Sequence, residues 1–240
     1  MTDRPKPGEA NEARIVRGTD ETRIVRATDE EHVVREFHRL YFDGPAGEGR
    51  VHHRTTWMGV PCLKCPLDLW VYQEILAQVR PALVVETGTH RGGSALFLAH
   101  ALDALGLGEI VSIDVLAGDG RPAHPRIRYV TGSSSDRDVV DPIFAGRDPE
   151  EPRVVILDSD HSREHVLREL AIFAPRVSSS GYLVVEDTNV NGRPVLPEHG
   201  PGPGEAVDEF LAANPEWERD RSREKFLLTY NPGGYLRRKA

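Results

Sequence analysis

The hydrophobic pattern of the chain changes near residue 81. From there to about residue 213, short apolar runs alternate with amphipathic stretches that have the 3.6-residue period of helices. The short runs are dense in β-branched residues, which is typical of buried strands. We expect strands at residues 82–86, 109–114, 127–131, 154–158 and 182–186, and helices at residues 92–105, 164–173 and 205–213. This alternation predicts an α/β fold with a doubly wound, mostly parallel sheet covered by helices on both faces.

The two ends of the chain have different patterns. Residues 226–230 and 235–237, split by Asn-Pro-Gly-Gly, predict a C-terminal antiparallel hairpin. Residues 67–79 have a helical period that ends before Pro81, and residues 1–35 carry a degenerate nine-residue repeat, too short for a solenoid unit. We therefore expect an extended or partly helical N-terminal arm that contributes to a homo-oligomer. The predicted organisation is an arm at 1–35, a helical preface at 36–80 and the main domain at 81–240.

Composition narrows the class of partner. The 240 residues are 39% hydrophobic and carry a net charge of −8, so the chain can bury a core but its average field repels phosphates. Nucleic acid and membrane surfaces are therefore not expected partners. No apolar run approaches the roughly 20 residues that cross a bilayer, and the N-terminus has no hydrophobic signal region. We expect a cytoplasmic protein that acts on a small molecule.

A glycine-rich stretch follows the first predicted strand of the main domain. Residues 86–94 read E-T-G-T-H-R-G-G-S, and His90 stands where the dinucleotide fingerprint G-x-G-x-x-G requires glycine. Nicotinamide and flavin binding therefore lose support. The remaining pattern suits S-adenosylmethionine, which has no pyrophosphate to place on the helix: Gly88 lets the backbone approach the ligand, and Gly92 opens the helix. A plain glycine-rich turn is the alternative.

Two further strand ends carry candidate cofactor ligands. The second strand ends at Asp114, whose carboxylate would accept hydrogen bonds from both ribose hydroxyls. The third runs into T-G-S-S-S-D, where Ser133 or Ser134 would receive the adenine. A solvated loop aspartate is the alternative for Asp114.

Acidic residues cluster at the ends of the fourth and fifth strands. The sequence D-S-D-H spans residues 158–161, and Glu186 and Asp187 follow the next strand. Side-by-side carboxylates are costly to desolvate without a cation, and hard oxygen ligands suit Mg²⁺. Helix capping by solvent-facing acids is the alternative, and Asp160 is the most ambiguous because it also precedes a predicted helix.

Two zinc patterns compete with this interpretation. Residues 161–165 match H-x-x-E-H, the motif of a group of zinc peptidases, but in the context of an α/β sheet. Cys62 and Cys65 form a single C-x-x-C with His52 and His53 upstream, which lacks the usual histidine spacing of a structural zinc site. Buried free thiols are the simpler explanation.

Several separated runs resemble a known family. They lie at residues 57–74, 84–97, 156–161, 182–188 and 200–207, and together they are similar to the cephalosporin hydroxylase family over roughly residues 50–238. Despite that name, the resemblance implies the Rossmann-like fold of class I S-adenosylmethionine-dependent methyltransferases. It also implies an active-site layout similar to that of the metal-dependent O-methyltransferases of catechols and macrolide sugars.

The resemblance implies roles for individual residues. The residues that line the methionine and ribose side would be Glu86, Gly88, Gly92 and Ser94, and Asp114 would hold the ribose. With Thr89, Ser133, Ser134 and Asp158 added, these are the predicted cofactor-binding residues. The metal would lie among Asp158, Asp160, Glu186 and Asp187, with Asp158 favoured over Asp160 by its register in the motif. His161, three positions after the first metal aspartate, would be the catalytic base.

The sequence thus predicts an O-methyltransferase that uses S-adenosylmethionine and Mg²⁺ or Mn²⁺. Its acceptor would be a hydroxyl of a small-molecule natural product, such as a sugar, a phenol or a β-lactam. The alternatives are a hydroxylase and a non-catalytic S-adenosylmethionine-binding partner of another enzyme. An iron-dependent hydroxylase would need two histidines and one carboxylate on a β-barrel, which this pattern does not predict. The loop at residues 189–204 would be either a lid or an ordinary connection.

Overall fold

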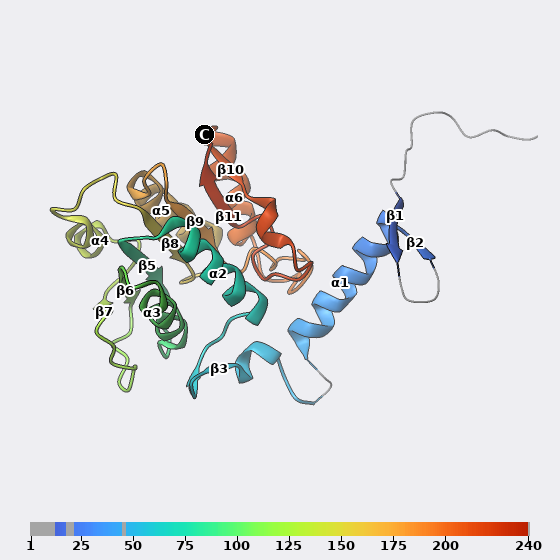
Figure 1. Cartoon of the computed structure of the whole chain (residues 1–240), viewed down its shortest axis with the longest axis horizontal. Helices are drawn as coiled ribbons and strands as arrows, with labels where there is room; N and C mark the ends of the chain where they lie inside the picture. Colours follow the sequence, from blue (N-terminus) through green and yellow to red (C-terminus); the bar gives the residue numbers. More distant parts are fainter. Residues whose placement is uncertain (1–12, 18–21, 45–46, 240) are drawn as a thin grey trace, which may run out of the picture.

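A seven-stranded sheet forms the centre of the protein. The computed structural model describes residues 13–17, 22–44 and 47–239. Strand order in the sheet is β10-β11-β9-β8-β5-β6-β7, and the pairs from β9 to β7 are all parallel (Figure 1). The parallel strands are β5 (Leu83–Thr87), β6 (Glu109–Asp114), β7 (Ile127–Thr131), β8 (Arg153–Leu157) and β9 (Tyr182–Val185). The predicted doubly wound α/β sheet is confirmed, with strand ends at most one residue from the expected positions.

Both faces of the sheet are buried, as its continuous apolar strands require. On one face, odd-numbered strand residues such as Val85, Val155 and Val185 pack against α4 (Arg137–Phe144), α5 (Arg163–Phe173) and α6 (Pro203–Ala213). On the other, even-numbered residues such as Val84 and Ile156 pack against α2 (Pro66–Val79) and α3 (Gly93–Leu105). Since alternate side chains of a strand point to opposite faces, one apolar run supplies two cores.

Local signals account for the ends of the helices. Pro66 occupies the first turn of α2, where its missing N–H costs nothing, and Pro81 follows shortly after the last turn. The side chain of Ser162 accepts a hydrogen bond from the backbone N–H of His165 and so caps α5. Gly106 ends α3 at φ +68°, a conformation that glycine adopts without strain.

The C-terminal antiparallel pair is present, but one of its strands is not where the sequence indicated. β11 (Tyr235–Arg238) pairs antiparallel with β9 and with β10 (Trp217–Arg219). The expected strand at residues 226–230 is wrong, because that segment contains no strand. Instead Thr229 and the Tyr230 backbone hydrogen-bond the carboxylate of Asp68, which is 2% exposed. Leu228 and Tyr230 are therefore buried by tertiary contacts rather than by strand pairing, whereas Leu227 is 54% exposed.

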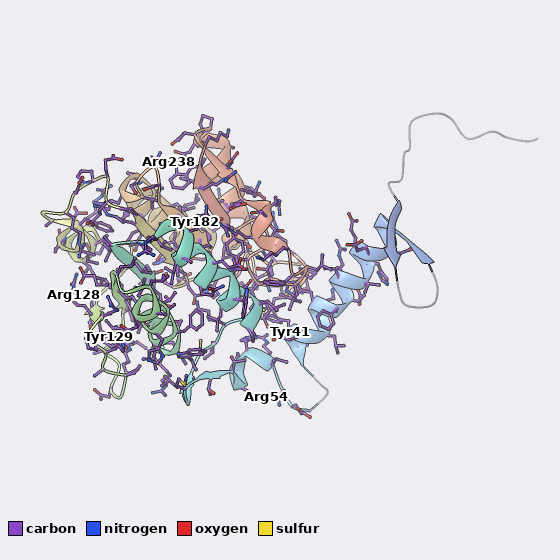
Figure 2. The ribbon with its side chains drawn as sticks, in the orientation of Figure 1. Tyr41, Arg54, Arg128, Tyr129, Tyr182 and Arg238 are labelled. Atoms are coloured by element: carbon purple, nitrogen blue, oxygen red, sulfur yellow. The ribbon has the colours of Figure 1, made fainter. Side chains whose placement is uncertain are left out.

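An arm precedes the sheet. β1 (Ala13–Arg17) and β2 (Thr22–Arg26) pair antiparallel, and α1 (Ala27–Asp43) connects them to the rest of the protein. In Figure 1 the strand pair and the start of α1 extend away from the sheet. The end of α1 packs against the main body, where Figure 2 labels Tyr41. There Arg39 donates to the Pro194 carbonyl and Asn189 hydrogen-bonds His38, so α1 contacts the loop before α6.

Short elements fill the remaining chain. They are the 3₁₀ helices η1 (Val51–Arg54), η2 (Ala174–Arg176) and η3 (Arg221–Glu224) and the paired strands β3 (Thr56–Trp57) and β4 (Val60–Pro61). In the part of the chain that the structure describes, no helix is long and apolar enough to cross a membrane. Cys62 and Cys65 are buried free thiols, as expected.

Candidate active site

A cleft of about 1440 Å³ lies at the carboxyl ends of β5, β6 and β8, next to the point where the strand order reverses. Ligands of doubly wound sheets bind at this position. Of the predicted site residues, those that line the cleft are Gly88, Asp114, Ser134, Asp158, Asp160, His161 and Asp187. Those that do not are Glu86, Thr89, Gly92, Ser94, Ser133 and Glu186.

Glu86 lies under the floor of the cleft. Its side chain is fully buried; Ser112 donates a hydrogen bond of 2.7 Å to Oε2, while Oε1 has no partner in the described structure. Burial raises the pKa of this carboxyl, and the Lys64 charge opposes that shift. A buried carboxylate oxygen without a donor is costly. Glu86 is therefore suited to a cationic or N–H-bearing ligand group.

Gly88 brings the ends of β5 and β8 together. It has φ +81°, and a Cβ there would lie 1.8 Å from the carbonyl oxygen of Asp158. Only glycine allows this approach, as the sequence indicated. Two residues after Gly88, the backbone N–H of His90 donates a hydrogen bond of 2.8 Å to Asp114 Oδ2. The glycine turn thus connects three strand ends.

We expect Gly88→Ala to lower the free energy of unfolding by about 2 kcal/mol more than Gly106→Ala, the matched control. Both glycines have positive φ, but a Cβ at Gly106 meets nothing within 4 Å, so the difference isolates the clash with Asp158. Urea denaturation of the two variants measures it. Equal losses would show that the strand ends adjust without cost.

Asp114 is held in place across the glycine turn. Its carboxylate accepts hydrogen bonds from the backbone N–H groups of His90 (2.8 Å) and Leu116 (2.9 Å) and pairs with Arg121 at 3.1 Å. These contacts fix its orientation at the wall of the cleft. The alternative of a freely solvated loop aspartate is not what the structure shows.

The two predicted serines differ in position. Ser134 lines the cleft and lies 3.3 Å from Nε2 of His165, whereas Ser133 hydrogen-bonds Ser135 beside it. The glycine and the serine at the start of α3 do not line the cleft. A Cβ on Gly93 would lie 2.1 Å from the Pro61 carbonyl oxygen, and Ser94, which is 8% exposed, forms a side-chain hydrogen bond that lowers the pKa of Glu86. Gly92, at φ +80°, opens α3 and faces the Tyr129 hydroxyl, and Thr89 hydrogen-bonds Ser112.

Three residues form the chemical centre of the cleft. His161 Nε2 lies 3.3 Å from Asp158 Oδ1, and its Nδ1 lies 3.2 Å from Asp187 Oδ2. One ligand atom from each of the three residues falls within 4.8 Å of the others. This donor set, at the ends of β8 and β9, fits a divalent cation.

The imidazole of His161 has a perturbed pKa. Burial disfavours its charged form, but the hydrogen bond to Asp158 and the negative charges of Asp187 and Asp158 outweigh that effect and raise the pKa to about 9. Without a bound metal ion, His161 therefore carries a proton at neutral pH and is a cation between two acids. A positive charge bound to these acids would remove the cause of the shift.

Asp187 owes its direction to an unusual backbone conformation. It has φ +53°, in the left-handed region, and its N–H donates to Oδ1 of Asn231 at 3.1 Å. The preceding residue, Glu186, is 4% exposed and does not line the cleft. The hydrogen bond to Asn231 thus holds Asp187 in a backbone conformation that is strained for a residue with a Cβ.

Glu186 is bound by residues that the sequence analysis did not assign to the site. Its Oε1 accepts hydrogen bonds from the Lys64 ammonium and from Tyr72 OH, the latter at 2.7 Å. Lys64 also pairs with Asp158 Oδ2. Burial lowers the pKa of Lys64, but Asp158, Glu186 and Glu86 outweigh burial and hold it well above its usual range. Only the position of Lys64 between two buried cysteines hinted at its inward direction.

Asp160 stands apart from this centre. It is exposed, and its carboxylate accepts a hydrogen bond of 2.8 Å from the Ser162 N–H at the start of α5. Asp160 is therefore not the cap of α5, which is Ser162, but it holds the backbone of that cap. Asp160 still lines the cleft, so its proposed metal role stays a prediction.

The zinc alternatives have no support in the described residues. The one group there that could hold a metal contains His161 but neither Glu164 nor His165, and none of Cys62, Cys65, His52 and His53. His165 instead approaches Ser134 and lies 3.7 Å from Glu169.

Comparison with known proteins agrees with this geometry. The model of the family Rhamnosyl O-methyltransferase/CmcI matches residues 49–239. The chain belongs to this family. The rhamnosyl O-methyltransferase of Mycobacterium leprae (strain TN) is 39% identical over 210 residues, covering 85% of this chain and 90% of that protein. Its counterpart in Mycobacterium tuberculosis (strain ATCC 25618 / H37Rv) is 39% identical over 208 residues, covering 84% of this chain and 83% of that protein.

Solved structures share the fold. A structure of CmcI with Mg and SAM superposes with a TM-score of 0.62 at 20% identity and covers 84% of each chain. The O-methyltransferase NovP gives a TM-score of 0.54 at 17% identity, covering 88% of this chain and 96% of NovP. Family membership confirms the resemblance and the predicted S-adenosylmethionine-dependent O-methyltransferase class.

Proposed function

We propose that this protein transfers the methyl group of S-adenosylmethionine to a sugar hydroxyl of a small-molecule natural product, with Mg²⁺ as metal cofactor. The observation that carries the proposal is the placement of His161 between Asp158 and Asp187 in the strand-end cleft. The curated relatives are named for methylating a rhamnosyl group, which favours a sugar among the acceptors considered.

The residues around the glycine turn fit the methyl donor. Glu86 offers a buried oxygen without a partner, suited to the ammonium of the methionine moiety, and Asp114 offers a fixed carboxylate to the ribose hydroxyls. Ser134, beyond β7, is suited to the adenine. Asp158, at the end of β8, lies between this donor side and the acids of the metal site, which fits the double role predicted for it.

The reaction requires few groups because methyl transfer from a sulfonium is an in-line displacement, favoured by positioning. A bound Mg²⁺ would lower the pKa of the acceptor hydroxyl, with Asp158, Asp187 and Glu186 as its proposed ligands. In neutral His161, one ring nitrogen donates to one of the two flanking carboxylates, and the other, which carries no proton, accepts the proton of the acceptor hydroxyl. The carboxylates of Asp158 and Asp187 orient the ring and stabilise the imidazolium that forms.

The rest of the cleft suits an acceptor with both polar and apolar faces. Its lining includes five apolar or aromatic residues from α1, η1 and the loops after β9 and before β11: Phe42, His52, Val190, Leu196 and Tyr230. Sugar rings bind well to such mixed aromatic and polar walls. The loop at residues 189–204, which carries Val190 and Leu196, is the part of this wall predicted as a possible lid.

Calorimetry tests the cofactor. We expect Asp114→Ala to weaken S-adenosylmethionine binding by about 1–2 kcal/mol, the scale of lost hydrogen bonds to a charged acceptor. Asp119→Ala is the control, because it removes the same charge from the exposed wall of the same cleft. Tight NAD binding without S-adenosylmethionine binding would refute the proposal.

We also propose that the protein is cytoplasmic and forms a homo-oligomer through its N-terminal arm. Support for the assembly comes from α1, on which Val33, Phe37 and Leu40 are more than half exposed at helical spacing. Light scattering of the full chain and of a Phe37→Glu variant measures the assembly. We expect the variant to dissociate; equal masses at the monomer value would contradict the proposal.

A further inference from the structure

Lys64 is the least expected residue in the site. It comes from the loop between β4 and α2, and its side chain is 4% exposed. A lysine is almost never buried this completely without an ionic partner. Here the ammonium pairs with Asp158 Oδ2 and Glu186 Oε1 at once.

The pairing uses one oxygen of each carboxylate. The other oxygen of Asp158, Oδ1, faces His161 at 3.3 Å, and Tyr72 shares Oε1 of Glu186 with the lysine. Lys64 therefore holds Asp158 by Oδ2 and Glu186 by Oε1. The lysine leaves Oδ1 of Asp158 and Oε2 of Glu186 for other partners. The same contacts place a positive charge against two of the residues that would hold the metal.

Charge balance explains why a lysine is needed there. Four carboxylates, those of Glu86, Asp158, Glu186 and Asp187, converge at the ends of β5, β8 and β9. Lys64 is the buried lysine among them, and a buried acidic cluster is unstable without nearby cations. A divalent ion would supply the rest of the positive charge only when it is bound.

We propose that Lys64 is a built-in counter-cation that holds Asp158 and Glu186 in place without metal and weakens the binding of the divalent ion. It is a positioning residue and contacts neither donor nor acceptor. The metal part of this inference rests on the proposed function. The consequence is a site that stays folded when empty and releases its metal readily.

The test compares Lys64→Met with Lys225→Met. Lys225 pairs with Glu74 on the surface, so its replacement controls for the loss of a lysine charge. In EDTA, we expect Lys64→Met to lower the Tm by about 10 °C, because two buried acids lose their cation, and Lys225→Met to lower it by less than about 3 °C. For Lys64→Met, we expect the Kd of Mn²⁺, measured by electron paramagnetic resonance, to fall about tenfold, since a repelling charge is gone.

A double variant covers the case in which Lys64→Met does not fold. Lys64→Met combined with Glu186→Gln removes one charge of each sign and should recover at least half of the lost Tm in EDTA. Unchanged or weaker Mn²⁺ binding by Lys64→Met, or no recovery in the double variant, would overturn the inference. Absence of Mn²⁺ binding by the unmodified protein would instead refute the metal in the proposed function, while the Tm comparison would still decide whether Lys64 balances the acids.

Discussion

Replacing His161 by alanine is expected to lower kcat by about a hundred- to ten-thousand-fold, the range for losing a positioned general base. An aliphatic hydroxyl has a pKa far above neutrality, so some group must take its proton as the methyl is transferred. His161 is the imidazole in contact with both cleft acids, Asp158 and Asp187. The affinity for S-adenosylmethionine should change little, because His161 lies beside the acids of the proposed metal site rather than beside the glycine-rich turn.

The pH dependence identifies the role of His161. As a base it works only when neutral, and its contacts with Asp158 and Asp187 raise its pKa to about 9 when no metal ion is bound. The rate should therefore rise with pH as His161 loses its proton, and this acid limb should disappear in His161→Ala.

His165→Ala is the matched control for His161→Ala. His165 lines the same cleft but contacts Ser134 and Glu169 rather than the metal acids. We expect it to raise KM for the methyl donor and to leave kcat within a few-fold. A His161→Ala variant with near-normal kcat and an unchanged acid limb would exclude His161 from the mechanism.

The second large effect is expected from the metal acids. Exhaustive chelation should abolish turnover, and either Mg²⁺ or Mn²⁺ should restore it, because an oxygen-rich site does not discriminate strongly between them. Asp187→Asn and Glu186→Gln should each lower kcat at least about a hundredfold and keep most of the cofactor affinity. Steady-state rates and calorimetry measure the two quantities separately.

A pair of variants decides which strand-end aspartate matters. Asp158→Asn should lose activity as Asp187→Asn does, because Asp158 contacts His161 and Lys64. Asp160→Asn should stay within a few-fold of the unmodified protein, since the asparagine oxygen can accept the same hydrogen bond from the Ser162 N–H. Full activity after chelation, or equal losses in both variants, would contradict the assignment.

Much of the fold could be predicted from local pattern. The runs at residues 109–114 and 127–131 form strands with the predicted ends, because β-branched and aromatic residues favour the extended conformation. The first of these strands is also buried, whereas the second is the partly exposed edge of the sheet. Strand alternation with helices then requires both faces of the sheet to be covered. The pattern also predicted where each strand ends. Because the cleft lies at these strand ends, it predicted the cleft positions of four residues: Gly88, Asp114, Asp158 and His161.

Contacts between distant segments could not be predicted in this way. Residues 226–230 have the composition of a strand, but the edge of β9 pairs with β11, and β10 completes the sheet from residues 217–219. Which of two apolar segments adds to a sheet edge depends on the packing of the whole chain. Local propensity does not contain that information.

The sequence by itself determined the order of the candidate groups along the chain. The glycine-rich turn, the acid proposed for the ribose and the acids proposed for the metal each follow directly after an apolar run. Only the tertiary structure decided which of these side chains meet. Lys64 lies 94 positions from its partner Asp158, and Asn231 lies 44 positions from the Asp187 N–H that it holds. The physical reason is that burial of apolar runs is a local property of the chain, whereas the direction of a polar side chain is set by the charge or hydrogen-bond partner that folding brings to it.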